Sequence, residues 1–283
     1  MAVPFGRRVV DAVAAHGPLC AGIDPSPGLL ARWGLPDDAD GLHRFADRCV
    51  EAFAGRIGVV KPQSAFFERH GAEGMAALER CIRTAAGAGL LVIADVKRAD
   101  IGSTMTAYAD AWLGPTSSLA ADAVTAVAYL GIGTLEPMFD MAADSGRGVF
   151  VVVRSSNPDG RFIQESRTGG GPGPSVEDAL LAEIARRNGA GGVVASTVGA
   201  VVGATTDPSD FPVAAIGGPV LAPGVGAQGA TAADVKRRFG DCPPGSVLPS
   251  ASRVLLERGP DAGALADAAR RLSDELAVAL PAP

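Results

Sequence analysis

The chain is poor in several residue types, and each shortage excludes a class of protein. Its 283 residues include only four cysteines and three histidines, and 5% of the residues are aromatic. No cysteines form a Cys-x-x-Cys pair, so buried thiols are expected rather than disulfides or a zinc site. The histidines lie outside the apolar runs, so we expect packing or surface roles for them and no metal site. These residues are Cys20, Cys49, Cys81, Cys242, His16, His43 and His70.

Positive charge and long hydrophobic runs are also scarce. The 25 Lys and Arg against 31 Asp and Glu give a net charge of 25 − 31 = −6. The chain contains no basic run, which argues against a nucleic-acid-binding surface. The longest apolar runs, such as Val149–Val153, have only the length of a strand and cannot span a bilayer. The first residues, MAVPFGRRVVDAV, lack the apolar stretch of a signal peptide. We therefore expect a soluble, reduced, cytoplasmic protein.

What the chain does contain is enough apolar material for a large core. Hydrophobic residues make up 47% of the sequence, too many for a disordered chain. Gly and Pro total 37 + 21 = 58 of 283 residues, about 20%, which falls short of the roughly 25–30% of low-complexity chains. A length near 280 fits two small domains or one large α/β barrel.

Short apolar runs alternate with helical stretches along the whole sequence. Continuous apolar runs bounded by turn residues indicate strands buried on both faces, as in a parallel sheet. The runs are Leu19–Ile23, Ile57–Val60, Leu90–Val96, Ala123–Leu130, Gly148–Val153, Gly191–Ala195, Pro219–Ala222 and Ser246–Leu248. Amphipathic stretches lie between them at Leu42–Ala54, Glu73–Ala86, Ile101–Leu113, Val176–Asn188 and Ala264–Leu280. Strand and helix repeated about eight times predict an α/β fold, a single (β/α)8 TIM barrel formed by residues 1–283.

Two segments do not fit this repeat. Thr168–Pro174 is a Gly/Pro loop without helix or strand potential, and Thr205–Gly218 contains Pro208 and Pro212, which argue against a regular sixth helix.

Charged and polar residues follow most of the apolar runs. In such barrels the chemistry lies where strands reach their carboxyl ends. The first three runs end at Asp24, at Lys61, and at Asp95 with Lys97, and the last ends near Arg253. Groups from several strands are thus predicted to meet at one rim, which stability alone does not explain.

Asp95 and Lys97 are the most informative pair. Being two residues apart on a buried strand, they share one face while Val96 takes the other. Two charges inside a barrel are unfavourable unless paired, so we expect them to pair, with Asp24 and Lys61 extending the array. The alternative is a purely structural ion pair that closes the barrel end.

The neighbouring residues also have simpler alternatives. Asp100 precedes a helical stretch and could be its N-cap. Asp24 precedes Pro25 and could form a turn. Lys61 precedes Pro62 and could be an exposed loop lysine.

The segment Asp95-x-Lys97-x-x-Asp100-Ile101-x-x-Thr104 resembles the signature of orotidine 5′-phosphate decarboxylases. The resemblance covers nearly the whole chain, in the order expected for that family, and its last four elements look most like the longer bacterial branch called type 2. The further matches are Leu19-Cys-Ala-Gly-Ile-Asp24-Pro25, Val60-Lys61-Pro62-Gln63-Ser-Ala-Phe-Phe67-Glu68, Tyr129-Leu-Gly131, Ser155-Ser156-Asn157-Pro158, Ala222-Pro223-Gly224-Val225-Gly226-Ala227-Gln228-Gly229 and Ser252-Arg253.

This resemblance implies decarboxylation of orotidine 5′-monophosphate to uridine 5′-monophosphate, the last step of de novo pyrimidine biosynthesis, without metal or organic cofactor. Loss of CO2 leaves carbanion character at C6 of the pyrimidine, which pre-placed groups must stabilise. Lys97 matches the family's proton donor, and Asp95 and Asp100 flank it. Asp95 would lie near the substrate carboxylate, where repulsion is relieved as CO2 leaves.

The resemblance also assigns the binding residues. Asp24 and Lys61 match contacts to the ribose hydroxyls, and Ser156 matches a serine that bonds the pyrimidine. Asp100, Ile101 and Thr104 match residues that reach into a partner subunit's site, which implies a homodimer. The phosphate ligands are implied to be backbone N–H groups at Gly224 and Gly226 and the side chains of Gln228 and Arg253. Ser156–Gly173 and Gly224–Gly229 are candidate lids.

The chain departs from the family pattern at one place, and two other functions remain open. Thr125-Ala-Val-Ala-Tyr129 lacks an expected Asn-Pro before the Tyr-Leu-Gly element. A magnesium-dependent hexulose-phosphate synthase or pentulose-phosphate decarboxylase would share Asp-x-Lys-x-x-Asp, although Ser-Ser-Asn-Pro and Gly-Ala-Gln-Gly favour a nucleotide. A non-catalytic nucleotide sensor is the other alternative, and the complete Asp95, Lys97 and Asp100 set argues against it.

Overall fold

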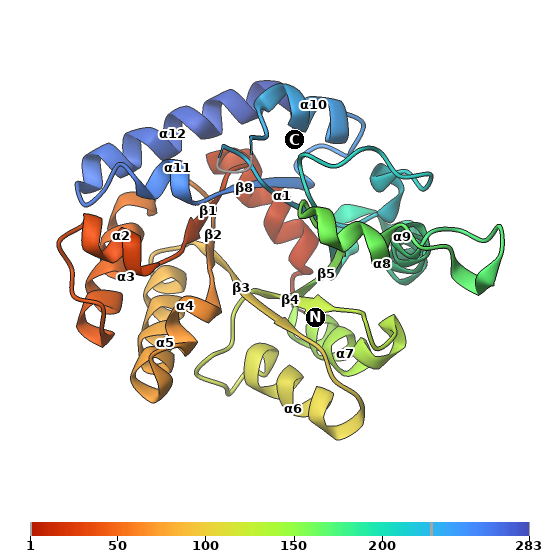
Figure 1. Ribbon diagram of the computed structural model, residues 1–283, viewed down its shortest axis with the longest axis horizontal. Helices are drawn as coiled ribbons and strands as arrows, with labels where there is room; N and C mark the ends of the chain where they lie inside the picture. Colours follow the sequence, from red (N-terminus) through yellow and green to blue (C-terminus); the bar gives the residue numbers. More distant parts are fainter. Residues whose placement is uncertain (1, 227–228, 283) are drawn as a thin grey trace.

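Eight parallel strands form a closed barrel in this computed structural model, which describes residues 2–226 and 229–282. Each strand pairs with the next along the chain and β8 pairs back with β1, so the ring seen in Figure 1 has no open edge. The predicted (β/α)8 fold is confirmed. The strands are β1 (Cys20–Ile23), β2 (Val59–Pro62), β3 (Leu91–Arg98), β4 (Ala123–Val127), β5 (Gly148–Arg154), β6 (Val198–Val202), β7 (Val220–Pro223) and β8 (Val247–Ala251).

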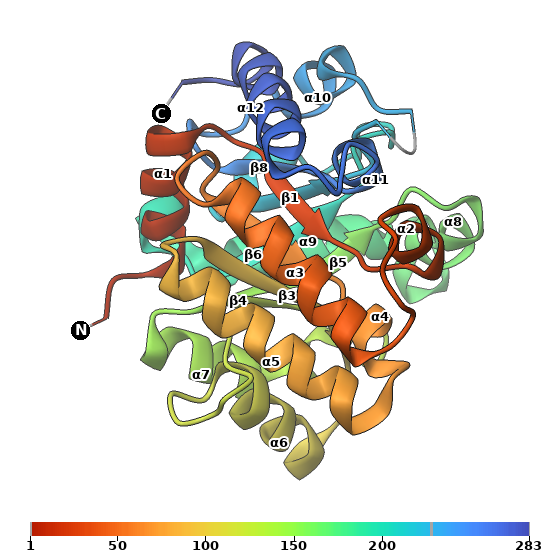
Figure 2. The same ribbon diagram turned by 90° about the vertical axis from the view of Figure 1, so that its left-hand side faces the viewer.

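Helices cover the outside of the barrel, and Figure 2 shows α12, α3 and α5 lying side by side over it. Polar residues fix several helix starts, because the side chains of Asp38, Ser175 and Asp261 accept backbone N–H groups of the first turn. The helices are α1 (Phe5–His16), α2 (Pro27–Arg32), α3 (Ala39–Phe53), α4 (Ser64–Glu68), α5 (Gly71–Gly87), α6 (Gly102–Leu113), α7 (Glu136–Ser145), α8 (Arg161–Gln164), α9 (Val176–Asn188), α10 (Ala232–Phe239), α11 (Arg253–Leu256) and α12 (Ala262–Ala279).

The sixth predicted strand is wrong. Gly191–Ala195 lies in short 3-10 turns, and the strand is formed by Val198–Val202, all of which is buried. Two apolar runs stand close together here, and Gly192 at φ +64° breaks the extended conformation of the first. The backbone N–H of Gly6 in α1 donates to the carbonyl of Ser196, which fixes the first run beneath the barrel. The prediction that 205–218 lacks a regular helix is confirmed, since only a 3-10 turn at Val213–Ile216 forms there.

The fourth strand is shorter than expected. It ends at Val127, and a turn closed by the Gly131 N–H donating to the Ala128 carbonyl follows. Tyr129 and Leu130, predicted as strand residues, are therefore exposed by 75% and 50%.

Helix α1 closes the amino end of the barrel, and in Figure 1 it is seen through the ring of strands. Its Phe5, Val9 and Val13 pack against inward side chains of the strands. The rings of Phe5 and Phe150 meet edge to face, with centroids 5.8 Å apart. The amino end is thus filled with apolar side chains and leaves only the carboxyl end for a polar site.

The strand pleat then decides which residues face that end. Inward positions recur every second residue, so the apolar layer made by Val59, Ile93, Ala123 and Leu248 is followed two residues later by another layer. That second layer contains Lys61, Asp95, Thr125 and Ser250. A polar layer therefore lies directly above the apolar plug.

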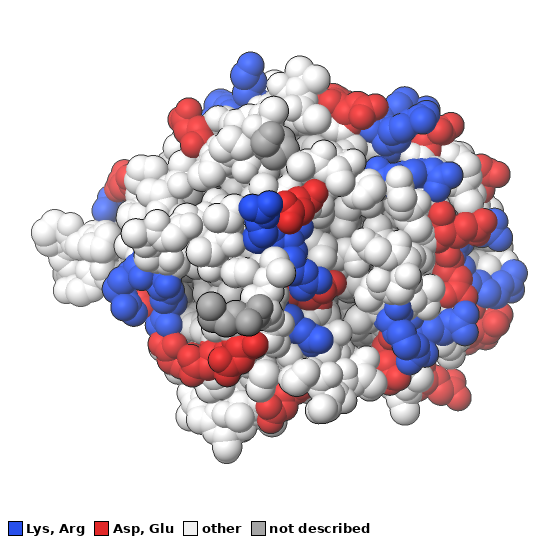
Figure 3. All heavy atoms as spheres, turned by 180° about the vertical axis from the view of Figure 1, so that it is seen from behind, with Lys and Arg blue, Asp and Glu red and all other residues white. Residues whose placement is uncertain are grey.

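The outer surface is mixed in charge. On the face shown in Figure 3, basic and acidic side chains are interspersed over a largely uncharged surface. None of the helices in the described part of the chain combines the length and apolar composition needed to cross a membrane.

Candidate active site

A cavity of roughly 460 Å³ opens at the carboxyl end of the barrel. Residues in or just after all eight strands line it, including Val201 of β6 and Leu221 of β7 as an apolar floor. Seven of the twelve predicted site residues lie in its wall: Asp24, Lys61, Asp95, Lys97, Ser156, Gly224 and Arg253. The barrel thus brings together residues more than 200 positions apart in the sequence.

Asp95 is the centre of the charged array. Its Oδ2 accepts the ammonium of Lys61 at 2.7 Å and its Oδ1 accepts that of Lys97 at 2.6 Å. The side chains of Lys61 and Asp95 are only 7% and 8% exposed, whereas that of Lys97 is 49% exposed. Lys97 is therefore the most exposed member of the array, although the buried Lys61 and Asp95 also line the cavity. The alternative in which Lys61 is an exposed loop lysine is wrong.

The array fixes the charge states of its buried members. Burial alone would raise the pKa of Asp95, but the ammonium groups of Lys61 and Lys97 outweigh it and hold the pKa well below its usual value. Burial alone would lower the pKa of Lys61, but the carboxylates of Asp95 and Asp24 raise it above its usual value. A buried carboxylate and a buried ammonium therefore both stay charged at neutral pH.

Beneath this array the thiol of Cys20 behaves differently. Burial raises its pKa to about 12, so it is an uncharged packing group at neutral pH. All four cysteines are free and buried, as predicted.

Asp24 follows β1 and leaves one acceptor unused. Its Oδ1 is buried and has no hydrogen-bond partner among the described residues. The backbone carbonyl of Asp24 accepts the N–H of Ser26, so the predicted turn is present as well. A buried carboxylate oxygen without a donor, facing a cavity, is suited to a ligand hydroxyl.

The opposite wall is suited to an anion. Gly224 and Gly226 adopt φ +114° and +74°, which side-chain-bearing residues rarely adopt, and the Gly226 N–H donates to the Ala230 carbonyl. Gly224 lines the cavity, whereas Gly226 does not. Arg253 begins α11 and lines the same cavity as Gly224, and its guanidinium forms no ion pair with the described residues. Gln228 lies outside the described residues.

Besides Gly226, three more predicted residues do not line the cavity of their own chain. Asp100, Ile101 and Thr104 do not line it, and Ile101 is 61% exposed. The alternative role of Asp100 as a helix N-cap is wrong, because Ile101 occupies the cap position and no side chain caps α6. The Asp100 carboxylate instead accepts the N–H of Ile101 at 2.8 Å. The exposed Tyr129 and Leu130 follow the neighbouring strand β4.

Reasoning from the sequence missed several polar residues in the wall. Thr125 and Ser250 lie on inward positions of β4 and β8, and Gln63 donates through its side-chain amide to the Asp95 carbonyl at 3.4 Å. The available signal was a hydroxyl residue inside an otherwise apolar run, as at Thr125 in Ala123–Val127.

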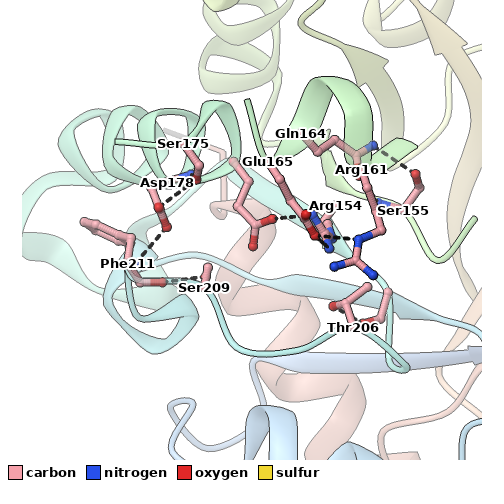
Figure 4. Close-up of polar contacts among 12 residues, drawn as sticks. Arg154, Ser155, Arg161, Gln164, Glu165, Ser175, Asp178, Thr206, Ser209 and Phe211 are labelled. Carbon is pink, nitrogen blue, oxygen red and sulfur yellow. Dashed lines mark hydrogen bonds and ion pairs between the residues drawn. The ribbon is translucent and has the colours of Figure 1, made fainter. Parts of the chain in front are cut away.

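A polar network fastens the rim behind β5 (Figure 4). Arg154, the last residue of β5, is buried and forms ion pairs with Glu165 and, at 3.0 Å, with Glu177 of α9. Gln164 of α8 accepts the Ser155 backbone N–H at 3.1 Å and donates to the Ser155 hydroxyl at 2.9 Å. Ser155, which lines the cavity, is thus tied to α8, and the preceding Arg154 is tied to α9.

Together these features define a class of protein, a (β/α)8 barrel with a charged, ligand-sized site at the carboxyl ends of its strands. A model of the orotidine 5′-phosphate decarboxylase / HUMPS family matches residues 17–267. The chain therefore belongs to this family.

Named relatives and solved structures agree with this assignment. The orotidine 5′-phosphate decarboxylase of Salinispora arenicola is 55% identical over 276 residues, which cover 98% of each chain. That of Streptomyces coelicolor is 49% identical over 280 residues and 99% of each chain. A crystal structure from Streptomyces avermitilis, named provisionally for the same enzyme, has a TM-score of 0.93 at 46% identity and covers 99% of this chain and 97% of its own.

Proposed function

We propose that this chain decarboxylates orotidine 5′-monophosphate to uridine 5′-monophosphate, the last step of de novo pyrimidine biosynthesis. The observation that carries the proposal is the buried Asp95 carboxylate held between the ammonium groups of Lys61 and Lys97, which both line the cavity and of which Lys97 is half exposed. Such an array is costly to bury and suits a reaction in which negative charge develops on a carbon atom. The named relatives that cover nearly the whole chain support it.

In the proposed reaction the bond between C6 and the carboxylate breaks and its electron pair stays on C6. Lys97 supplies positive charge beside C6 and then transfers a proton from Nζ to that carbon, which yields the product and CO2. The lysine regains its proton from water. Asp95 fixes the Lys97 ammonium at 2.6 Å and lies near the substrate carboxylate, and Asp100 completes the flanking pair.

The remaining wall binds the nucleotide. Asp24, with its unpaired buried oxygen, and Lys61 contact the ribose hydroxyls, and Ser156 bonds the pyrimidine. Arg253 binds the phosphate together with the backbone N–H at Gly224 and the side chain of Gln228. The expected N–H contact from Gly226 is not proposed, because that group donates to the Ala230 carbonyl and Gly226 does not line the cavity. Arg253 forms no ion pair with the described residues, which supports this assignment, because an arginine that lines a cavity without a carboxylate partner is suited to an anion.

We also propose that residues 1–283 act as one domain within a homodimer that shares its active sites. Asp100, Ile101 and Thr104 act in the partner's site, which is supported by their position outside their own cavity. The exposed side chains of Ile101, Tyr129 and Leu130 provide apolar area for such a contact. The cytoplasmic location stays a prediction that the four free thiols support.

The first experiment follows the absorbance of orotidine 5′-monophosphate in the presence and absence of EDTA. Loss of the substrate signal with uridine 5′-monophosphate as the product supports the proposal, and EDTA is expected to leave the rate unchanged. Lys97→Ala should abolish turnover while the protein still binds the product. Turnover that persists in Lys97→Ala would overturn the mechanism.

A second candidate follows from the family description, which also includes HUMPS proteins. A hexulose-phosphate synthase or pentulose-phosphate decarboxylase of this fold would act on acyclic sugar phosphates and depend on magnesium. Activity on such a substrate that EDTA abolishes, without conversion of orotidine 5′-monophosphate, would favour this alternative.

Subunit complementation tests the shared sites. Lys97→Ala and Asp100→Ala should each be inactive alone, because every site then lacks one residue. In a mixed dimer one site carries both changes and the other carries neither, so random mixing should restore about a quarter of the wild-type activity. Mixtures that stay inactive while the subunits exchange would show that Asp100 acts in its own chain's site or in none.

A further inference from the structure

Thr125 contacts both Asp95 and Lys97 of β3. It is 1% exposed, occupies an inward position of β4 and lines the cavity. Its hydroxyl donates to Asp95 Oδ1 at 2.8 Å and accepts the backbone N–H of Lys97 at 3.0 Å. One side chain therefore holds the carboxylate of Asp95 and the main chain of Lys97 at the same time.

The main chain at Lys97 needs such a support. Lys97 has φ +46° and is the one residue other than glycine with a positive φ in the described part of the chain. This left-handed conformation is unfavourable for a residue with a side chain and persists only where its surroundings enforce it.

The strand pairing does not supply this support. Ala94 of β3 pairs with Val124 of β4, but the next pair is Arg98 with Ala126, so β3 advances four residues while β4 advances two. The regular ladder is interrupted across this bulge, where Lys97 lies. The Thr125 hydroxyl accepts the Lys97 N–H in place of a strand carbonyl.

We propose that Thr125 is a positioning residue that aligns Lys97 with Asp95, an inference that rests on the proposed role of Lys97 as proton donor. The bulge turns the Lys97 side chain so that its ammonium returns to Asp95 Oδ1, the same oxygen that Thr125 bonds. Without the hydroxyl, the Lys97 N–H loses its acceptor and Asp95 Oδ1 loses a donor. The backbone at Lys97 is then free to leave the left-handed region and carry the ammonium away from C6.

Thr125→Val tests this role because it keeps the β-branched shape and removes only the hydroxyl. We expect kcat to fall about 10–100-fold, the range in which small misplacements of reacting groups act. KM should change by less than about 3-fold, since the ribose and phosphate contacts are untouched. Thr125→Ser keeps the hydroxyl and should retain kcat within about 3-fold of the wild type. Affinity for uridine 5′-monophosphate should be unchanged in both variants.

Ser246→Ala is the matched control. Ser246 is fully buried before β8, at the amino end of the barrel, and its hydroxyl donates to the Pro243 carbonyl at 2.6 Å. Its loss removes a buried hydroxyl bond far from the cavity and should leave kcat unchanged. If Thr125→Val does not fold, Thr125→Ala replaces it. The ratio of kcat between the serine and alanine variants then measures the contribution of the hydroxyl to turnover.

The outcomes separate this role from others. A kcat for Thr125→Val equal to that of the wild type, an effect on KM alone, or a serine variant as slow as the valine variant would each overturn the inference. A wild-type chain inactive on orotidine 5′-monophosphate would instead overturn the proposed function. The crystal structure of Thr125→Val then decides the positioning role by itself, because Lys97 should leave the left-handed region, and an unchanged Lys97 contradicts the inference.

Discussion

Replacement of Asp95 by asparagine removes the negative charge on which the buried array depends. The shape is kept, but asparagine offers one acceptor oxygen where the carboxylate accepts Lys61 at 2.7 Å and Lys97 at 2.6 Å. Its amide group must therefore face one ammonium. The side chain of Lys97 is half exposed and can turn into the cavity, whereas that of Lys61 is 7% exposed and stays buried.

The magnitude follows from the burial of Lys61. Removing one partner of a buried ion pair lowers the free energy of unfolding by about 3–5 kcal/mol. We expect a loss near the low end, about 3 kcal/mol, because the Asp24 carboxylate and the single asparagine oxygen still interact with the Lys61 ammonium. At about 2–4 °C per kcal/mol, the melting temperature should fall by roughly 6–12 °C. Turnover should be lost as well, because the ammonium of Lys97 is no longer fixed.

The assay is thermal unfolding of Asp95→Asn beside Asp47→Asn, a matched change in an exposed pair. Asp47 accepts Arg80 at 2.6 Å with both side chains at least 40% exposed, so its loss should cost about 0–1 kcal/mol. An Asp95→Asn protein that melts no lower than the Asp47→Asn control would refute the reasoning that Asp95 stabilises a buried cation.

The pKa shifts of Asp95 and Lys61 fix the direction in which the stability of the fold depends on pH. The pKa of Asp95 is lowered in the folded state, so its contribution to stability is complete above the unfolded value of about 4 and is lost as the pH falls through the folded value. The pKa of Lys61 is raised, so its contribution is complete below about 10.4 and is lost as the pH rises through the folded value. Neither contribution of the wild-type pair should change between about pH 5 and 9. A contribution that fades within this window would contradict the assignment.

Three further changes test other parts of the site and surface. Arg253→Ala should raise KM about 10–100-fold through lost charge-assisted phosphate bonds with little change in melting temperature, and unchanged steady-state kinetics would refute the phosphate assignment. Gln164→Ala removes two hydrogen bonds to Ser155 and should raise KM roughly 5–30-fold, whereas a change in melting temperature without a change in KM would refute a role in the rim. Leu130→Asp should shift a dimer to monomers in sedimentation, and Val278→Asp, at an 85% exposed position on α12, should not.

Local sequence patterns predicted much of the fold. Seven of the eight strands lie where apolar runs predict them, because a strand buried on both faces needs a continuous apolar run. The exception, Gly191–Ala195, satisfies the same pattern but packs beneath α1 instead. Pattern alone does not distinguish two adjacent apolar runs, since the contact that decides between them joins residues about 190 positions apart.

The site divides in the same way. The sequence by itself determined the chemical groups at the strand ends and the pairing of Asp95 with Lys97. The reason differs from the regular two-residue pleat, because a bulge and a left-handed backbone at Lys97 bring its ammonium back to Asp95. Only the tertiary structure decided that Lys61 is buried and Lys97 reachable, that Thr125 supports a left-handed lysine, and that Asp100 lies outside its own cavity. Closure of the barrel sets these relations, because burial and hydrogen-bond partners depend on neighbouring strands whose residues lie far apart in the chain.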